Sequence, residues 1–306
     1  MALTYGQLSS ITEKKFLPRM YDNIFDSNPL LARAKKNFYR KLDGGESIQV
    51  PLNYATTSSS GWYAGADTLS TNDSDTITAA NYSWKQLYAK IAISRADELK
   101  NAGDAGKVNL VKSKMKIAEK TMADSLGTGL YNSGATANAI IGLRDIVATD
   151  QTVGGISQTS YSWWAGNVDS STTTLTIASM QAVFNDASVD SEIPSVIMMT
   201  RANLNRYHAL LQANQRFVDS DAARGGFTSL LFNGKACIAD SHCPANHIFY
   251  LNEDHLHLFV HKQEDFRMEP FASPINQNVK VAGIYWMGAL GSSNNRLHGV
   301  QTALTA

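Results

Sequence analysis

The chain has 306 residues, of which 43% are hydrophobic and 18% charged, and its 27 basic and 27 acidic residues give no net charge. This length suits one large domain or two smaller ones, with a core that needs neither a metal nor disulfides. The balanced charge disfavours a sequence-specific nucleic-acid binder, which usually carries a basic excess. A low share of charged residues leaves less solvated surface, so we expect part of the surface to contact partners.

The number of cysteines and the length of the apolar runs disfavour two further classes of protein, secreted and membrane-spanning ones. Cys237 and Cys243 are the only cysteines, too few for a secreted disulfide scaffold, so we interpret them as free thiols. Residues 1–5 do not begin a signal peptide, and no apolar run approaches the ~20 residues needed to cross a bilayer. We therefore expect a protein that is made and used in a cytosol, with no membrane contact.

The first 41 residues are polar, with scattered short apolar anchors. They contain a basic cluster made of Arg33, Lys35, Lys36, Arg40 and Lys41. This composition predicts short helical pieces on an extended arm, because it holds too few apolar residues for a core of its own. We expect the arm to lie on a neighbouring molecule, since terminal segments are ordered only when something ties them down.

A long hairpin is predicted over 43–93. Apolar and polar residues alternate over 46–54, which predicts a strand, and Pro51 confines that strand to a sheet edge. The return strand is predicted over 82–93, where a shift of the apolar phase near Lys85 indicates a bulge. An isolated two-stranded ribbon is only marginally stable, so this one is expected to pack on its own domain or across another subunit.

The far end of the hairpin, 56–81, is rich in Ser, Thr, Asp, Asn and Gly and has few bulky residues. Aromatic side chains in such a polar loop are good interface anchors. The residues that we assign to subunit interfaces are Trp62, Tyr63, Leu69, Arg33, Lys35, Lys36 and Arg40.

Two helices are predicted after the hairpin. A capping-box pattern at 94–98 begins a short helix that Gly103 ends. A longer helix is predicted from about 107 to 131, where apolar residues spaced by three or four form one stripe. At 1.5 Å per residue this helix would be about 37 Å long. The stripe is too short to indicate a coiled coil and favours packing of one helix face on a sheet.

The remainder, 134–306, alternates short strands with a few helices. Strands are predicted over 195–199, 248–251 and 255–260, and a helix begins after Thr200. Between the apolar runs of 230–238 lie Asn233 and Gly234, a strong hairpin signal. No internal repeat and no regular βαβ alternation are visible, so the predicted fold class is α+β.

The order of these parts resembles that of the major capsid proteins of tailed bacteriophages, which have the Hong Kong 97 type of fold. The stretches that carry the resemblance are 48–52, 82–85, 141–147, 154–156, 163–164, 232–234, Asp240, Pro244, 248–252 and 256–258. Each is a common strand or turn, so the resemblance rests on their order and spacing, which cover nearly the whole chain.

The resemblance implies a division of the chain. Its parts are an N-terminal arm at 1–41, an extended loop at 42–84, a peripheral domain at 85–137 with a spine helix at 107–131, an axial domain at 138–262, and a return to the peripheral domain with closing strands at 263–306. In this family the arm and the extended loop embrace neighbouring subunits.

The resemblance also implies a function. Copies of the chain would assemble as hexamers and pentamers into the icosahedral head that encloses the double-stranded DNA of a tailed phage. We expect a location in the virion, after assembly in the cytoplasm of the host bacterium. A portal and a separate scaffolding protein are expected partners. Whether a decoration protein also binds stays open, and packaged DNA would be contacted non-specifically. No catalytic residue, cofactor or metal is expected.

One departure from the family can be read directly. Some members join subunits covalently through a lysine near the loop tip and an asparagine of another chain, but this sequence has no lysine between Lys41 and Lys85. We therefore expect a shell held by non-covalent contacts. The presence of Met1 predicts that no N-terminal scaffolding segment is removed, which is why a separate scaffolding protein is expected.

Five histidines lie near the two cysteines, at positions 242, 247, 255, 257 and 261. His255, His257 and His261 would share one face of a strand, where residues at i and i+2 can reach one zinc ion. The spacing matches no standard zinc module, so we prefer a solvent-facing side of a strand. A nucleophile built from Cys243 is less favoured, because no nucleophile elbow or phosphate-binding loop accompanies it.

Two alternatives stay open from the sequence. The first is another phage virion protein, such as a tail-tube subunit, which would lack the long helix between the hairpin and the α+β domain. The second is a hydrolase that uses the Cys/His cluster and works as a monomer or small oligomer.

Overall fold

The computed structural model describes residues 28–57, 59–69, 75–100, 104–134, 138–212 and 230–305. Residues 1–27, most of the expected arm, lie outside the described residues. No helix in the described part of the chain is long and apolar enough to cross a membrane.

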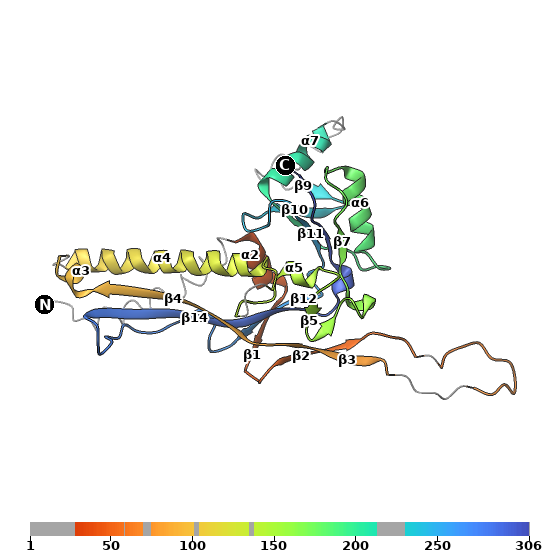
Figure 1. Cartoon of the computed structure of the whole chain (residues 1–306), viewed down its shortest axis with the longest axis horizontal. Helices are drawn as coiled ribbons and strands as arrows, with labels where there is room; N and C mark the ends of the chain where they lie inside the picture. Colours follow the sequence, from red (N-terminus) through yellow and green to blue (C-terminus); the bar gives the residue numbers. More distant parts are fainter. Residues whose placement is uncertain are drawn as a thin grey trace.

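A five-stranded sheet forms the elongated half of the molecule (Figure 1). Its strands are β1 (Tyr39–Leu42), β4 (Lys85–Ser94), β12 (Leu256–His261), β13 (Arg267–Met268) and β14 (Val279–Ser292). β4 and β14 are antiparallel partners over all ten residues of β4. Since β14 continues past β4 to pair with β12, it connects the far end of this half with the centre of the molecule.

The long helix predicted from the apolar stripe is confirmed as α4 (Asp104–Leu130), which follows the short α3 (Arg95–Lys100). Figure 1 shows α4 lying lengthwise along β4 and β14. Met115, Met122 and Leu126 are buried because the 3.6-residue period places them on the face that meets the sheet.

A six-stranded sheet forms the second half. Its strands, in spatial order, are β7 (Asn167–Asp169), β15 (Gly299–Gln301), β11 (Ile248–Leu251), β8 (Val196–Met199), β10 (Lys235–Ala239) and β9 (Leu230–Phe232). The helices α6 (Ile177–Asp186) and α7 (Arg201–Gln212) contribute to the cluster of buried side chains on one face. The predicted turn between β9 and β10 is confirmed, with Asn233 and Gly234 both at positive φ, as such a turn requires.

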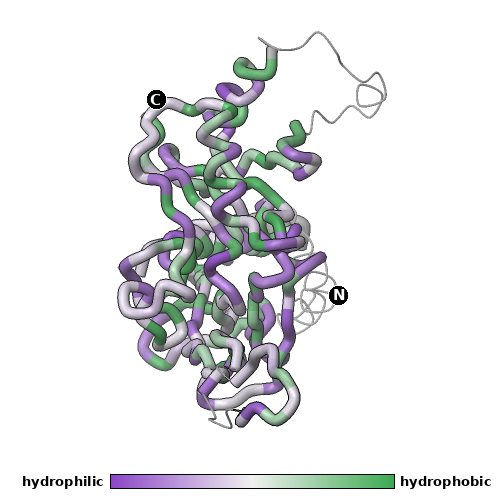
Figure 2. Tube along the Cα trace, turned by 90° about the vertical axis from the view of Figure 1, so that its right-hand side faces the viewer, coloured by the Kyte–Doolittle hydropathy of each residue, from purple (hydrophilic) through white to green (hydrophobic). Residues whose placement is uncertain are grey.

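The two sheets share one hydrophobic core. In β8, Ile197 and Met199 face α6 and α7, whereas Val196 and Met198 belong to the cluster that also contains Met115 of α4. Figure 2 shows hydrophobic stretches recurring through both halves of the chain, interspersed with hydrophilic ones. One continuous core therefore holds the two sheets against each other.

A separate hairpin of β2 (Ile48–Asn53) and β3 (Ile77–Tyr82) projects from this body (Figure 1). The expected continuation of the hairpin to residue 93, with a bulge near Lys85, is wrong. The strand ends at Tyr82, and β4 begins at Lys85 as a partner of β14. The shift of apolar phase thus marks the point where the chain changes from one sheet to another.

The last part of the expected arm also differs from the prediction. Residues 28–42 form α2 (Pro29–Asn37) and β1, which pairs in parallel with β12. Asn28 caps the helix by accepting hydrogen bonds from the backbone of Leu30 and Leu31, and both leucines are buried in the common core. These residues are therefore part of the body and not of an extended arm.

The expected boundaries of the second half need correction as well. β12 was expected to close the region 138–262, but it pairs with β1 and β14 in the first sheet. β15 was expected to return to the first half, but it pairs with β7 and β11 in the second sheet. The chain therefore passes between the sheets three times, once between β4 and β7 and again over 252–255 and over 293–298. Small elements complete the fold: α5 (Leu143–Ile146), β5 (Thr152–Val153), β6 (Ile156–Ser157), η1 (Ser162–Trp164) and η3 (Asn295–Leu297).

Candidate assembly surfaces

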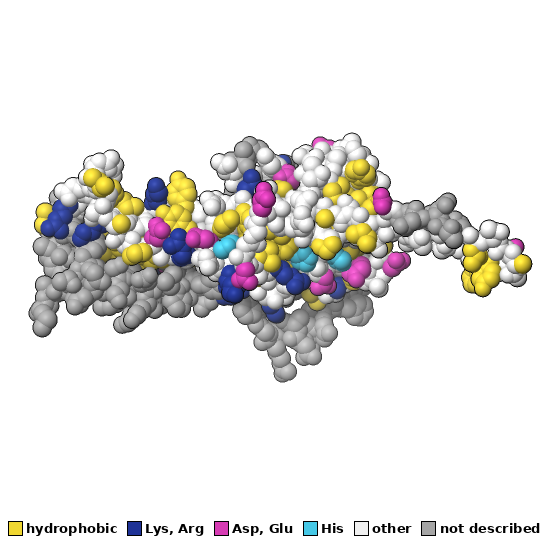
Figure 3. Space-filling model, turned by 90° about the horizontal axis from the view of Figure 1, so that it is seen from below, with side chains coloured by type: hydrophobic (Ala, Val, Ile, Leu, Met, Phe, Trp, Pro, Cys, Tyr) yellow, Lys and Arg dark blue, Asp and Glu magenta, His cyan; other side chains and the backbone are white. Residues whose placement is uncertain are grey.

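The far end of the β2–β3 hairpin exposes bulky apolar side chains. Trp62 is fully exposed (105%), and Tyr63 and Leu69 are exposed by 67% and 58%. Figure 3 shows hydrophobic side chains gathered at this tip, far from the body of the molecule. Exposed aromatic residues held away from any core are typical of contact sites for another molecule.

The hairpin is anchored at its base. The Tyr54 ring stacks on Trp163 with ring centres 5.1 Å apart. The backbone N–H of Asn81 donates to the carbonyl oxygen of Gly154 at 2.8 Å, and Trp84 Nε1 donates to the carbonyl oxygen of Gly45 at 2.9 Å. These contacts fix the base of the hairpin to the body of its own chain.

The hairpin carries charge of one sign. Between Lys41 and Lys85 the sequence has no basic residue, but it has five acidic ones, Asp43, Glu46, Asp67, Asp73 and Asp75. Of these, Asp43, Glu46, Asp67 and Asp75 lie among the described residues, and all four are exposed. Asp43, near the base, forms an ion pair with Lys262 at 3.1 Å.

An open groove of about 440 Å³ lies between α4 and β4. Its lining residues are Tyr88, Ala89, Lys90, Ile91, Ala92, Lys114, Ile117, Ala118 and Thr121. Tyr88 and Ile117 are each 63% exposed, which gives the groove two large apolar side chains that face solvent. Lys90 and Lys114 supply positive charge, so the groove is both apolar and basic.

β4 is the edge strand of its sheet along this groove. β14 pairs with one of its edges, and no strand among the described residues pairs with the other. Lys114 Nζ donates to the carbonyl oxygen of Ala92 at 2.9 Å, which identifies Ala92 as a residue whose carbonyl points toward the groove. In an antiparallel pair such groups alternate along the strand, so Tyr88, Lys90 and Ala92 all present backbone groups to the groove.

The basic residues assigned to interfaces fall into two groups. Arg33 binds within its own chain, since its guanidinium forms an ion pair with Glu253. Lys35 and Lys36 on α2 and Arg40 on β1 have exposed side chains. The structure therefore separates Arg33, which has a structural role in this chain, from the other three.

The histidines and cysteines near 237–261 are dispersed. Both thiols are buried, and burial raises the pKa of Cys237 to about 12 and raises that of Cys243 as well. His247 stacks on Phe249, and His261 contacts the edge of Trp84. Within the ranges that the structure describes, no three histidine, cysteine or acidic side chains lie close enough to hold a metal ion.

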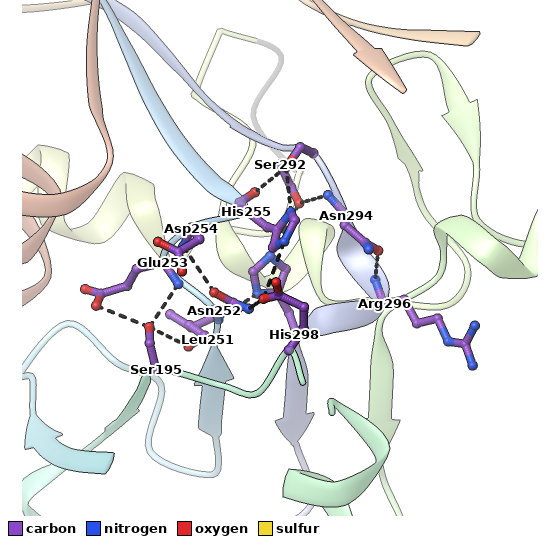
Figure 4. Close-up of polar contacts among 12 residues, drawn as sticks. Ser195, Leu251, Asn252, Glu253, Asp254, His255, Ser292, Asn294, Arg296 and His298 are labelled. Carbon is purple, nitrogen blue, oxygen red and sulfur yellow. Dashed lines mark hydrogen bonds and ion pairs between the residues drawn. The ribbon is translucent and has the colours of Figure 1, made fainter. Parts of the chain in front are cut away.

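A polar network occupies the place where the chain passes between the two sheets (Figure 4). His298, fully buried, lies at its centre. The backbone N–H of Asn252 donates to His298 Nδ1 at 3.2 Å, and His298 Nε2 lies 3.3 Å from Ser292 Oγ. Burial is the main cause and the neighbouring His255 and His257 are smaller causes that together lower the pKa of His298 to about 3, so its ring is neutral at pH 7.

Sequence patterns gave no signal for this network or for the groove. Asn252 and His298 are separated by 46 positions, and β4 and α4 meet through long-range packing. The exposed tip, in contrast, was assigned from the local pattern of bulky residues in a polar loop.

The sequence matches no protein-family model and no curated protein. The structure is similar to several solved shells, of which three follow. It superimposes on the capsid asymmetric unit of cyanophage A-1(L) with a TM-score of 0.69 and 18% identity, over 88% of this chain and 91% of that one. For the capsid of a native GTA particle the TM-score is 0.63 with 11% identity, over 90% of each chain. For the holo-SrpI encapsulin complex of Synechococcus elongatus PCC 7942 it is 0.58 with 10% identity, over 89% and 87%.

These similarities confirm the predicted α+β fold of the Hong Kong 97 type. They extend over 88% and 90% of this chain. At such low identities they establish the fold alone.

Proposed function

We propose that this chain is the major capsid protein of a tailed bacteriophage, which assembles with copies of itself into the icosahedral head around double-stranded DNA. The observation that carries the proposal is the fold shared with capsid subunits along nearly all of the chain. The projecting hairpin adds independent support, because no core formed by the described residues covers the apolar side chains at its tip.

The tip favours association on energetic grounds. Burying a large apolar side chain contributes about 1.5–3 kcal/mol. Trp62 and Tyr63 are exposed in the single chain, so a partner that covers them gains this contribution twice, minus the entropy of ordering the loop. An interface repeated around a symmetric shell needs only modest strength at each copy.

The partner surface that we propose for the tip is the α4–β4 groove of a second copy. The loop is acidic and the groove is basic, so the two surfaces attract each other. The groove also offers Tyr88 and Ile117 as apolar contacts and the free edge of β4 as a source of backbone hydrogen bonds. A loop with no lysine between Lys41 and Lys85 would be held there by non-covalent contacts.

Further partners are part of the same proposal. Assembly would take place in the host cytoplasm with a portal and a separate scaffolding protein, and the finished shell would contact packaged DNA without sequence preference. The exposed side chains of Lys35, Lys36 and Arg40 are suited to a neighbouring subunit or to phosphate groups. Chain neutrality favours weak DNA contacts over specific recognition.

A catalytic role has little physical support. The two thiols have raised pKa values, and a thiol must lose its proton to act as a nucleophile. The match to an encapsulin makes a protein shell around another cargo the more relevant alternative, because that shell shares the fold. A phage capsid and an encapsulin shell differ in their cargo and not in the fold of their subunits.

Electron microscopy of the full chain tests the proposal. We expect closed shells, or hexamers and pentamers, when the chain is expressed with or without a co-expressed scaffolding protein. Particles run on a denaturing gel should give one band near 33.3 kDa, because no covalent crosslink is expected. Tubes, or small particles with hydrolase activity, would contradict the proposal. Shells purified from their natural source that hold protein cargo in place of double-stranded DNA would favour the encapsulin alternative.

A further inference from the structure

Two of the chain's passages between its sheets, over 252–255 and over 293–298, are neighbours in the fold. His298 connects the two passages through its ring, which binds Asn252 of the first and Ser292 at the start of the second. Its backbone oxygen also accepts a hydrogen bond from the N–H of Asn167 in β7, at 3.0 Å. His298 is therefore one of the residues that join the two passages (Figure 4). Another is Ser293, whose backbone N–H donates to the carbonyl oxygen of His255 at 2.9 Å.

We propose that His298 is an acid-released latch between the two sheets, which joins the two passages while its ring is neutral and lets them separate when the ring takes up a proton. The inference does not depend on the proposed function, because every residue of the latch belongs to a single chain.

The geometry fixes the form of the neutral ring. A backbone N–H can only donate, so His298 Nδ1 must accept from Asn252 and carries no hydrogen. The hydrogen is then on Nε2 and points to Ser292 Oγ, which also accepts from the backbone N–H of Asn294 at 3.1 Å. A proton added at Nδ1 would face the N–H of Asn252, and two donors would then oppose each other in a buried site.

The surroundings oppose a positive charge on the closed latch. His298 is fully buried, which is the main cause of its lowered pKa, and His255 and His257 lower that pKa to a smaller extent. The other charged or titratable groups near the junction are Glu192, Glu253, Asp254, Arg33, Arg40, Arg296 and Tyr82. Of the carboxylates, Glu253 is neutralised by Arg33, and Glu192 lies 3.9 Å from His255 and contacts Asn252. Among the described residues, no carboxylate forms a hydrogen bond or an ion pair with the His298 ring, whose partners are Asn252 and Ser292.

Two neighbouring groups make separation less costly. Both polar atoms of the Asn295 side chain and Nδ1 of His257 are buried without a hydrogen-bond partner. Such groups gain hydrogen bonds to water when the passages separate. These unpaired groups lie beside the hydrogen bonds that hold the junction closed, which are those of the His298 ring and those between Ser293 and His255.

Linkage gives the size of the response. The open latch takes up a proton with the ordinary histidine pKa of about 6.5, whereas the closed latch does so at about 3. Lowering the pH from 7 to 5 should therefore raise the population of the open latch by about 25-fold.

Hydrogen exchange of the full-length chain, followed by mass spectrometry at pH 7 and pH 5 and corrected for the intrinsic exchange rate, tests this inference. We expect peptides that cover 252–255 and 293–298 to lose protection by about 25-fold at pH 5, as linkage requires. Peptides from the centres of α4 and β14 should keep their protection. An unchanged junction, or an equal loss in every peptide, would overturn the inference.

The variant His298→Gln supplies the second test. Glutamine offers one acceptor and one donor but does not titrate near these pH values, so its junction should show equal protection at pH 7 and pH 5. His208→Gln removes a histidine of α7 and should keep the response of the original chain. A folded His298→Gln that still responds to pH would count against the latch. If that variant does not fold, the exchange experiment on the original chain tests the latch alone. Local loss of protection at pH 5 then supports the latch, and retained protection overturns it.

Discussion

Arg33 of α2 and Glu253 of the turn after β11 form a bidentate ion pair with two hydrogen bonds. Arg33 Nε donates to Glu253 Oε1 at 2.7 Å, and Arg33 Nη2 donates to Oε2 at 2.6 Å. The Glu253 side chain is only 7% exposed, and its backbone N–H donates to Ser195 Oγ. This pair joins α2 to the passage between the sheets, so it ties the start of the described chain to its centre.

Replacing Arg33 by Ala should destabilise the subunit by about 2–4 kcal/mol, because it leaves a buried carboxylate without its partner. Lys36→Ala, on the exposed side of the same helix, is the matched control and should change stability by less than about 0.5 kcal/mol. Urea unfolding of unassembled subunits measures both. Equal effects of the two variants would show that the ion pair contributes nothing to folding.

Changing Trp62 and Tyr63 together to Ser should impair assembly and leave subunit stability unchanged. Both side chains are exposed in the single chain, so folding gains nothing from them, whereas an interface anchor contributes about 2 kcal/mol or more. The critical concentration for assembly, measured by light scattering, should rise at least about tenfold. Ile275→Ser removes an equally exposed residue outside the hairpin and should not alter assembly. Normal assembly of the double variant would exclude the tip as an anchor.

Reversing the charge of Lys90 to Glu should weaken assembly, because this residue lines the groove proposed to receive the acidic loop. Adding Asp75→Lys should restore part of the lost assembly, since attraction then returns with opposite signs. High salt should reduce the difference between the variants, because exposed charges are screened. Sedimentation velocity at two salt concentrations measures assembly. If adding Asp75→Lys restores no assembly to Lys90→Glu, the loop does not bind in the α4–β4 groove.

Gly127→Ala should destabilise the subunit by about 1–3 kcal/mol through overpacking. A Cβ at Gly127 would meet the side chain of Asn28 and would lie 2.8 Å from Cε1 of His242. That close approach lets α4 contact both the cap of α2 and the loop after β10. Gly61→Ala is the control, because a Cβ there would meet nothing within 4 Å. Thermal unfolding compares them, and similar Tm values would mean that the contact can relax.

Subunit stability should fall in acid because of buried neutral histidines. Burial, with the charge of Arg144 as a smaller cause, lowers the pKa of His247 to about 4. As the pH falls from about 6.5 to 4, the unfolded chain binds a proton that the folded chain does not, so stability is lost by up to about 1.4 kcal/mol per pH unit for each such residue. His247→Gln should show a shallower decline in urea unfolding between pH 7 and 4. An unaltered slope would mean that His247 does not contribute.

The sequence by itself determined the local elements of this protein. The apolar stripe of α4, the turn at Asn233 and Gly234, and the exposed tip at Trp62 are all set by residues within a few positions of one another. Each of these elements can therefore be predicted from its own stretch of sequence. The order of these elements was also enough to identify the fold class, because fold families keep element order when single motifs are lost.

Only the tertiary structure decided which strands pair and which polar residues meet. The shift in the apolar alternation near Lys85 is the same for a bulge and for a change of sheet, because each of them reverses which face of the strand is buried. Arg33 and Glu253 are 220 positions apart, and His298 meets Asn252 only because β11 and β15 are neighbours. Such contacts depend on long-range strand pairing, which no local pattern specifies, and that is why the latch and the α4–β4 groove emerged from the fold alone.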